Sequence, residues 1–238
     1  MAAIIVNLEC ITNMHVGNGD VNFNIIDNEV ERDVTTGYPT INASGVKGAL
    51  REYFERNKVD EKMISAIFGK ENAGKLKFLC ADMLALPMRA SEGNASYYMV
   101  TTKEAVKLYK EKCQMFLGKE ISDVFVDNTM GKQAVEGIKL KEKWDGKEIY
   151  IISDKDFKKT SLPVIARNKL DNGISKNLWY EEVVPHKALF TFVVLAEDCD
   201  KTYLDAFKNE INGKIVQFGG NASIGYGLCK VSVDEKEA

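Results

Sequence analysis

The sequence has little histidine, no closely spaced cysteines and no strong net charge, and each lack narrows the possible functions. With only His15 and His186, a histidine-rich metal centre is not expected. The five cysteines show no CxxC spacing, which argues against a structural zinc site and is typical of a reducing cytoplasm. The sequence also lacks an apolar run as long as a membrane span, and its first residues lack the features of a signal peptide. We therefore expect a cytoplasmic protein with no membrane partner.

A strongly basic domain would indicate nucleic-acid binding, but the net charge of this chain is −3. The charge is unevenly distributed, however, because residues 155–176 hold five Lys and one Arg against two Asp. A nucleic acid would therefore be held by local basic stripes rather than by the field of the whole protein. With 238 residues, the chain can bury a substantial core as one large domain or as two small halves.

The hydrophobic pattern predicts an α+β fold. Strands are predicted over residues 2–12, 75–85, 133–141, 147–152, 188–197, 214–218 and 228–233, and helices from residue 44 and over residues 61–68, 102–117 and 202–211. A turn is expected at residues 86–89. Asp171-Asn172-Gly173 is a turn signal that predicts a hairpin or an extended arm between Lys155 and Pro185. The two ends of the chain are each compatible with a ferredoxin-like half, although no sequence repeat supports a duplication.

The start of the first helix has the composition of an anion site. Ser44 is expected to cap the helix, and Lys47 and Arg51 share one face near the positive end of its dipole. Gly45 and Gly48 leave room for a backbone to approach closely. This pattern predicts a phosphate site, and the alternative is an ordinary amphipathic helix with a solvated cationic face.

Acidic residues gather just before this helix, at Asp27, Glu29, Glu31 and Asp33. A loop carboxylate is most often solvated or forms a turn. The functional alternative for Asp27 is a ligand for a divalent cation, or a base that helps a ribose 2′-OH attack its neighbouring phosphate. His15 is a candidate proton shuttle, and it could equally contact RNA or be structural.

A glycine-rich run at residues 219–227 lies between two predicted strands. This position excludes the dinucleotide-binding fingerprint and the P-loop, because both need a helix directly after the glycines. The run is either a long hairpin connection or a source of backbone amides for a ribose-phosphate chain. Trp179 and Tyr180 precede Pro185; at least one is expected to pack inward, and an exposed one could stack against a base.

Several segments together resemble a known family. In chain order they are HVGNGD, IDNEVERDVTTGYPTINASGVKGALR, FGKENAGKLKFLCADMLALPMR, VTT, LWYEEVVP and QFGGNASIGYGLCKV. They resemble the RAMP superfamily of CRISPR-associated proteins, and within it the backbone subunit of type III-B (Cmr-type) effector complexes. The segment AGKLKFLCADMLALPMR separates this branch from the type III-A (Csm-type) backbone.

The resemblance implies one RAMP domain over residues 1–238. Its ferredoxin-like palm would carry an RRM-like sheet, inserted fingers at about residues 55–135 and a thumb hairpin at residues 161–184. Such subunits stack as a helical filament along a guide (CRISPR) RNA, and target RNA is cut at regular intervals where each thumb interrupts the duplex. The implied partners are guide RNA, target RNA, copies of the chain itself and other Cmr-type subunits. The chain is shorter than most members, so its fingers or thumb are expected to be trimmed.

The family motifs also assign roles to residues. The catalytic Asp of the family is followed after a short gap by an Arg–acid pair, which places the role on Asp27, with a divalent cation such as Mg²⁺ or Mn²⁺. At the helix start, Gly45 replaces the usual second Ser, which removes a hydroxyl contact and keeps the backbone amide. The predicted RNA-binding residues are Ser44, Gly45, Lys47, Arg51, Arg32, Arg167, Lys169, Gly219, Gly220, Asn221, Gly225 and Gly227, and the catalytic candidates are Asp27 and His15.

Three other functions remain open from the sequence. The chain could be a backbone subunit that presents the guide without cutting. It could be an endonuclease that processes the guide precursor with His15 as general acid–base. A small-molecule enzyme with a phosphate pocket is the third, and the lack of a P-loop or dinucleotide fingerprint weighs against it.

Overall fold

A computed structural model describes residues 1–19, 25–90, 95–121, 125–130, 133–139 and 148–236. The elements are β1 (Ala2–Cys10), β2 (Thr40–Ile41), α1 (Ala43–Arg56), α2 (Glu61–Phe68), β3 (Leu76–Phe78), β4 (Ala81–Arg89), β5 (Tyr97–Thr101), α3 (Lys103–Lys112), β6 (Phe125–Met130), β7 (Gln133–Lys139), β8 (Glu148–Ile151), α4 (Asp154–Phe157), β9 (Val164–Asp171), β10 (Ile174–Glu182), β11 (Leu189–Ala196), α5 (Lys201–Ile211), β12 (Ile215–Gln217) and β13 (Leu228–Glu235). A π-helical turn (Cys113–Leu117) extends α3. Within these described ranges, no helix is long and apolar enough to cross a membrane.

The main sheet has the strand order β12-β13-β1-β11-β4-β5-β8-β7-β6. Its central part, β13-β1-β11-β4, is antiparallel throughout, with α1 following β1 and α5 following β11. This is the ferredoxin-like arrangement, as expected for the palm. The two ends of the chain do not form separate halves, because β1 pairs with both β11 and β13. They interleave in one sheet.

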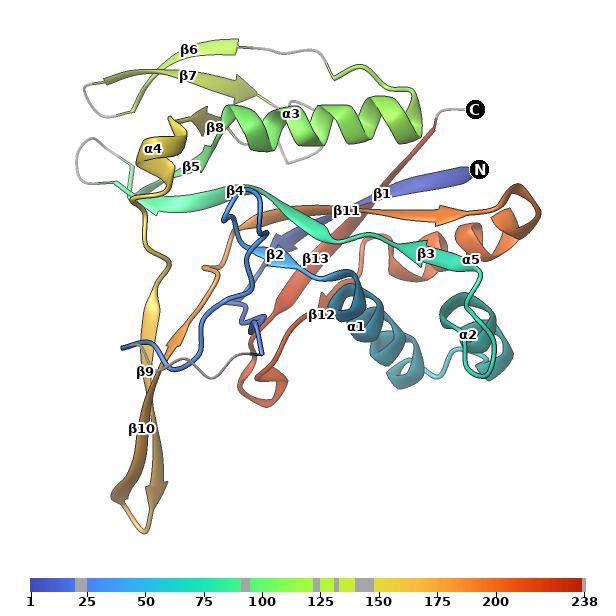
Figure 1. Ribbon diagram of the computed structural model, residues 1–238, viewed down its shortest axis with the longest axis horizontal. Helices are drawn as coiled ribbons and strands as arrows, with labels where there is room; N and C mark the ends of the chain where they lie inside the picture. Colours follow the sequence, from blue (N-terminus) through green and yellow to red (C-terminus); the bar gives the residue numbers. More distant parts are fainter. Residues whose placement is uncertain (20–24, 91–94, 122–124, 131–132, 140–147, 237–238) are drawn as a thin grey trace.

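Helices cover both faces of the sheet, with α1, α2 and α5 on one side and α3 on the other (Figure 1). Alternate residues of β1 supply the two cores, because successive strand side chains point to opposite faces. Ile4, Val6 and Leu8 belong to the cluster that contains Leu50 of α1, whereas Ile5 belongs to the cluster of α3. Aromatic rings fill the first core; in one pair, the Phe54 and Phe207 rings stack with centroids 5.7 Å apart.

Several predicted elements are confirmed. Helix α2 spans the predicted residues and ends at Gly69, which has a positive φ of 83°. Thr102 caps α3 by accepting a hydrogen bond from the backbone N–H of Ala105, and α3 with its π-helical turn fills the predicted range. The predicted ends of two strands, at residues 140–141 and 147, lie outside the described residues.

The expected cap at Ser44 is wrong. Helix α1 begins at Ala43, and Val46 N–H already donates to the carbonyl of Asn42, so Asn42 holds the N-cap position. The Asn42 side chain makes no capping hydrogen bond. Ser44 is instead an exposed residue of the first helical turn.

The predicted strand at residues 75–85 and the turn that follows it also differ from the structure. The strand is divided into β3 and β4, and β4 continues to Arg89 where a turn was expected. Pro87 lacks a backbone N–H, but this part of β4 pairs with β5 alone, while β11 pairs with residues up to Ala85. Proline is tolerated where one edge of a strand needs no ladder bond.

Strands β9 and β10 form a two-stranded hairpin that extends away from the body of the protein (Figure 1). Its turn contains Asn172 and Gly173, both with positive φ, as the turn signal predicted. The hairpin lies within the range predicted for the thumb. The division of the chain into palm, fingers and thumb stays a prediction.

Candidate functional site

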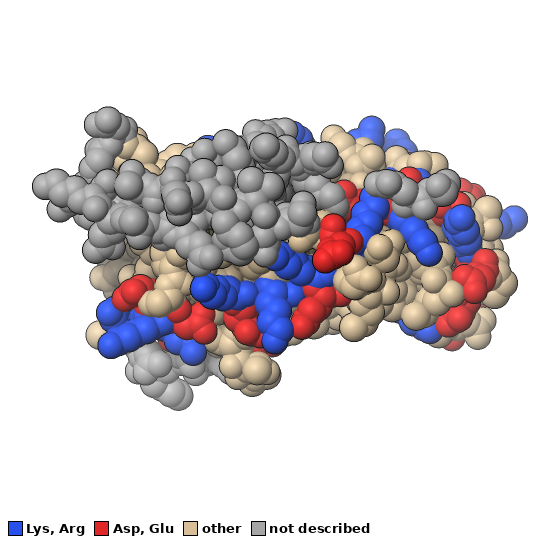
Figure 2. Space-filling view, turned by 90° about the horizontal axis from the view of Figure 1, so that it is seen from above, with Lys and Arg blue, Asp and Glu red and all other residues tan. Residues whose placement is uncertain are grey.

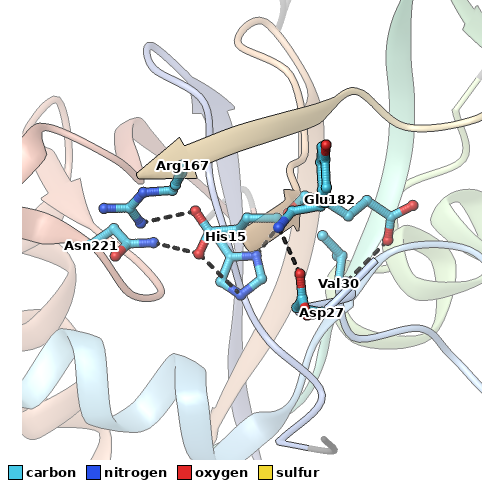
Figure 3. A network of polar contacts seen from close by, with 8 residues as sticks. His15, Asp27, Val30, Arg167, Glu182 and Asn221 are labelled. Carbon is cyan, nitrogen blue, oxygen red and sulfur yellow. Dashed lines mark hydrogen bonds and ion pairs between the residues drawn. The ribbon is translucent and has the colours of Figure 1, made fainter. Parts of the chain in front are cut away.

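Asp27 lies on a loop that runs beside the base of the hairpin (Figure 3). The Asp27 carboxylate accepts a hydrogen bond of 2.8 Å from the backbone N–H of Tyr180, and the Asp27 N–H donates to the Tyr180 carbonyl. Glu182 N–H donates to the carbonyl of Asn28, which adds a second backbone link. Asp27 remains exposed. The loop therefore presents one carboxylate to solvent from a position that the hairpin backbone holds.

Glu182 fixes the other side of this loop. Its side chain is buried, with 5% of its surface exposed, and accepts from Val30 N–H at 3.0 Å and from the Arg32 guanidinium at 2.5 Å. Arg32 was predicted to bind RNA. It forms an ion pair that ties the Asp27 loop to β10, while 39% of its side chain stays exposed.

Glu181 points to the opposite face of β10, as strand geometry requires. It is 3% exposed and accepts hydrogen bonds from Arg167 of β9 at 3.0 Å and from Asn221 of the glycine-rich loop at 2.9 Å. The Nε2 atom of His15 lies 3.9 Å from the same carboxylate. Glu181 thus joins the segments that carry His15, Arg167 and Asn221, and these three residues lie close together in Figure 3.

His15 is buried between these segments. Its Nδ1 donates to the backbone carbonyl of Glu182 at 2.7 Å, because a carbonyl oxygen can only accept. Its Nε2 atom lies close to Gly17, where an added Cβ would be 3.0 Å away. These contacts give His15 a structural role. The predicted general acid–base role stays a prediction, and a side chain that is 11% exposed offers little surface to RNA.

The glycine-rich loop packs tightly against the segment that carries His15. Gly219 has a φ of +77°, and a Cβ there would lie 2.3 Å from the His15 carbonyl oxygen. Gly220 N–H donates to that carbonyl, and Gly227 N–H donates to the Asn13 carbonyl. The glycines at 219 and 227 therefore serve close packing, and the amides of Gly220 and Gly227 are used inside the chain. Gly225 also has a positive φ but faces open space.

The two cations of α1 that were predicted to bind RNA differ in their contacts, and the third, Arg56, pairs with Glu52. Arg51 donates to the Glu55 carboxylate at 2.8 Å and to the Gly69 carbonyl at 2.9 Å, so it joins α1 to the end of α2. Lys47 makes no ion pair or hydrogen bond through its side chain to any described residue. Ser44 and Gly45 are exposed beside it. Lys47 is therefore the α1 cation that is available to a phosphate.

The predicted contacts on the hairpin also fall into two groups. Arg167 is engaged by Glu181 and lies over the Trp179 ring, 5.2 Å from its centroid. Lys169 is exposed and lies two residues nearer the hairpin turn than Arg167. Tyr180 has 40% of its surface exposed, whereas Trp179 is half-buried. Of the two aromatic residues, Tyr180 is the one able to stack on a base, which agrees with the prediction that one of them packs inward.

Tyr38 closes the turn that follows the Asp27 loop. Its hydroxyl donates to Asp154 or Thr102, at 3.0 and 2.9 Å respectively. Burial raises the pKa of the Tyr38 hydroxyl, and the Asp154 carboxylate raises it further. Tyr38 therefore stays neutral and links the loop to α4.

The residues do not form a metal site by themselves. Among the residues that the structure describes, no cluster of three or more His, Cys, Asp and Glu side chains could hold a metal ion. Asp27 is paired with a backbone N–H of the hairpin instead. The predicted divalent cation stays a prediction.

Sequence reasoning missed Glu181 and Glu182 as the residues that organise the site. The available signal was a pair of adjacent carboxylates in a strand between aromatic residues and buried valines, where solvated acids are unexpected. A buried carboxylate needs partners, and those partners are the residues predicted for RNA binding, Arg32, Arg167 and Asn221.

A ferredoxin-like sheet with a protruding hairpin and a glycine-rich loop defines the class of this protein. The sequence profile of the RAMP superfamily matches residues 7–230, and the chain belongs to that superfamily. Within it, the chain is similar to the CRISPR system Cmr endoribonuclease Cmr4 of Pyrococcus furiosus, with 29% identity over 288 aligned positions that cover 99% of this chain and 97% of that protein. The resemblance to Cmr-type proteins is thereby confirmed.

Solved structures agree with this placement. The crystal structure of oligomeric Cmr4 from Pyrococcus furiosus is similar with a TM-score of 0.73 and 26% identity, covering 99% of each chain. A chain in the cryo-EM structure of the type III-B Cmr-beta complex bound to cognate target RNA shares the fold with a TM-score of 0.80 and 23% identity. That similarity covers 98% of this chain and 97% of the other.

Proposed function

We propose that the chain is a guide-RNA-binding backbone subunit of a type III-B effector complex, and that it cuts target RNA with Asp27 as the catalytic carboxylate. The similarity to an endoribonuclease over nearly the whole of both chains supports an RNA-cleaving activity. The observation that carries the assignment is the position of Asp27. It is exposed, while the hairpin backbone holds it in place.

In this proposal Asp27 acts on the ribose next to the cleaved bond. The carboxylate accepts the proton of the 2′-OH as the oxygen attacks the adjacent phosphorus. A bond forms between the 2′-oxygen and phosphorus, and the bond from phosphorus to the 5′-oxygen breaks. The products are a 2′,3′-cyclic phosphate and a 5′-hydroxyl, whose oxygen takes a proton from water. A divalent cation remains part of the proposal only as a requirement to be tested, and no step above depends on it.

The guide would be held by contacts that ignore its sequence. Lys47 is free to bind a phosphate beside the exposed start of α1. In the glycine-rich loop, the backbone amides of Asn221, Ala222 and Ser223 have no intrachain acceptor among the described contacts, so they can also donate to a phosphate. The basic residues lie among acidic ones on the face shown in Figure 2, so local contacts rather than a broad basic surface would bind RNA.

The proposed partners follow from the relatives. A Cmr4 relative crystallised as an oligomer, and a structural neighbour belongs to a type III-B complex. We expect copies of this chain to stack along the guide RNA with other Cmr-type subunits at the ends.

The decisive experiment uses the assembled complex with target RNA complementary to its guide. A ladder of evenly spaced products is expected, and Asp27→Asn should lower the cleavage rate by about 100-fold or more while guide binding persists. Glu29→Gln is the matched control, because Glu29 lies on the same loop and its side chain has no ion pair within the described residues. Its cleavage rate should stay within about twofold of the wild type.

Each alternative gives a different outcome. Full cleavage by Asp27→Asn would refute the Asp27 assignment. The absence of products from the wild-type complex would indicate a guide scaffold without activity, and a single cut in guide precursor alone would indicate a processing enzyme. Loss of the ladder on chelation with EDTA, and its return with Mg²⁺, would support the predicted cation.

A further inference from the structure

A basic hollow lies beside the candidate site. It is lined by residues 86–89, 96, 97, 100, 159–163 and 185–187 and has a volume of about 510 Å³. A neighbouring hollow of about 580 Å³ shares Leu86 and residues 159–162 with it and extends to Arg32 and Glu182. The basic hollow is therefore adjacent to the junction that holds the Asp27 loop.

The charge of the basic hollow is one-sided. Arg89, Lys159 and Lys187 line it together with His186, and the described lining contains no Asp or Glu. Lys159 pairs with Asp156 at 3.0 Å, so Arg89 and Lys187 carry the positive charge that no described ion pair uses. Arg89 is exposed and has no ion-pair partner among the described residues. In a chain with a net charge of −3, this is a local concentration of positive charge.

Tyr97 and Lys187 form the aromatic side of the hollow. The Lys187 ammonium lies 5.4 Å from the centroid of the Tyr97 ring, and 40% of Tyr97 is exposed. Lys187 has a φ of +73°, a conformation that residues other than glycine rarely adopt. Its backbone N–H donates to the Cys10 carbonyl at 2.6 Å, which holds the turn in place. Glycine would fit this turn with less strain, so the side chain can be removed there without disturbing the backbone.

We propose that the basic hollow binds one unpaired nucleotide of single-stranded RNA, with the phosphate between Arg89 and Lys187 and the base against the Tyr97 ring. The proposal rests on the proposed function, which supplies the RNA. Aromatic rings hold unpaired bases without regard to sequence, and a volume of this size suits a small ligand. The neighbouring hollow, which reaches Arg32 and Glu182 beside the Asp27 loop, would lead an RNA strand from that loop into this one.

The test is photo-crosslinking of the full chain to a short single-stranded RNA that contains 4-thiouridine, followed by mass spectrometry of the crosslinked peptide. A crosslink to the peptide that contains Tyr97 is expected. By fluorescence anisotropy, Tyr97→Ala should weaken binding of the labelled RNA by at least about fivefold, and Tyr97→Phe should keep the affinity. UMP as a competitor distinguishes a free nucleotide from one within RNA. Displacement of the RNA by UMP at equal concentration would identify a mononucleotide site and overturn the RNA assignment.

Lys187→Gly provides a variant that should not unfold the protein, because glycine relieves the strained backbone. It should abolish the Tyr97 crosslink and weaken RNA binding by at least about threefold. Lys58→Gly is the matched control, since Lys58 is also a lysine with a positive φ, of 57°, and is an exposed residue outside the basic hollow. It removes the same charge and relieves the same strain, and binding should not change.

The proposal for the basic hollow would be overturned by one combined result. Crosslinks would be confined to α1 or the glycine-rich loop, and Tyr97→Ala and Lys187→Gly would bind RNA with normal affinity. Such a result would leave the proposed function intact, because the target ladder depends on Asp27. A wild-type complex without a ladder would instead refute the cleavage activity, even if Tyr97 crosslinked to RNA. Variants that change only self-association, without any crosslink at Tyr97, would also overturn the proposal.

Discussion

Asp27 and the pair Glu181–Glu182 are carboxylates of the same junction with opposite surroundings. Asp27 is exposed and receives one backbone hydrogen bond, whereas Glu181 and Glu182 are buried and each accept from two donors through their side chains. The buried acids hold the hairpin, the glycine-rich loop and the Asp27 loop together. The comparison teaches that the candidate carboxylate can stay exposed because a buried carboxylate, Glu182, holds its loop in place.

Removing the buried carboxylate of Glu181 should cause the largest loss of stability. Glu181→Ala leaves Arg167 and Asn221 without their acceptor, and the free energy of unfolding should fall by about 3 kcal/mol. Urea unfolding followed by circular dichroism measures the change. Glu29→Ala, on the neighbouring loop, should change it by less than about 0.5 kcal/mol. Equal effects from both substitutions would show that burial at Glu181 does not stabilise the junction.

The glycine-rich loop, which contacts Glu181 through Asn221, also contains a tightly packed glycine and one in open space, and the two can be compared. In Gly227→Ala, the new Cβ would lie 1.8 Å from the Phe218 carbonyl oxygen, so we expect a loss of free energy of unfolding of about 2 kcal/mol. Gly225→Ala is the control, because it has a similar positive φ of +80° with open space around it. Its loss should be about 1 kcal/mol, from backbone strain alone. Thermal unfolding of the two variants would separate close packing from conformational strain, and equal losses would rule out the close approach.

Substitutions of Lys47 and Arg51 should have the smallest effects on stability. Lys47 has no described side-chain partner, whereas Arg51 bonds to Glu55 and Gly69. Arg51→Ala should lower the free energy of unfolding by about 1 kcal/mol, because it loses its hydrogen bond to Gly69. Lys47→Ala should leave stability unchanged and lower the slope of log affinity for guide RNA against log salt by about one. Titrations at several salt concentrations measure this slope. An unchanged slope in Lys47→Ala would remove Lys47 from the guide contacts.

Local patterns were sufficient for much of the fold. Helix α2 has its Gly69 stop, Thr102 caps α3, and Asn172-Gly173 makes the hairpin turn, so short-range chemistry determined each of these elements. The predictions were wrong where contacts with residues distant in sequence determine the bounds of an element. Helix α1 starts before Ser44, and β4 runs through Pro87 because β5 supplies its partner there. A single sequence gives no information about which strand edge will stay unpaired.

The candidate site divides in the same way. The sequence by itself determined the family, the catalytic candidate Asp27 and the cationic start of α1, because motifs and helix periodicity are local. Only the tertiary structure decided which charged groups are free. Arg32, Arg167 and Asn221 are engaged by buried glutamates, and Arg51 binds the end of α2, while Lys47 stays available. The reason is physical: a buried carboxylate must be paired, and its partners come from segments that only folding brings together.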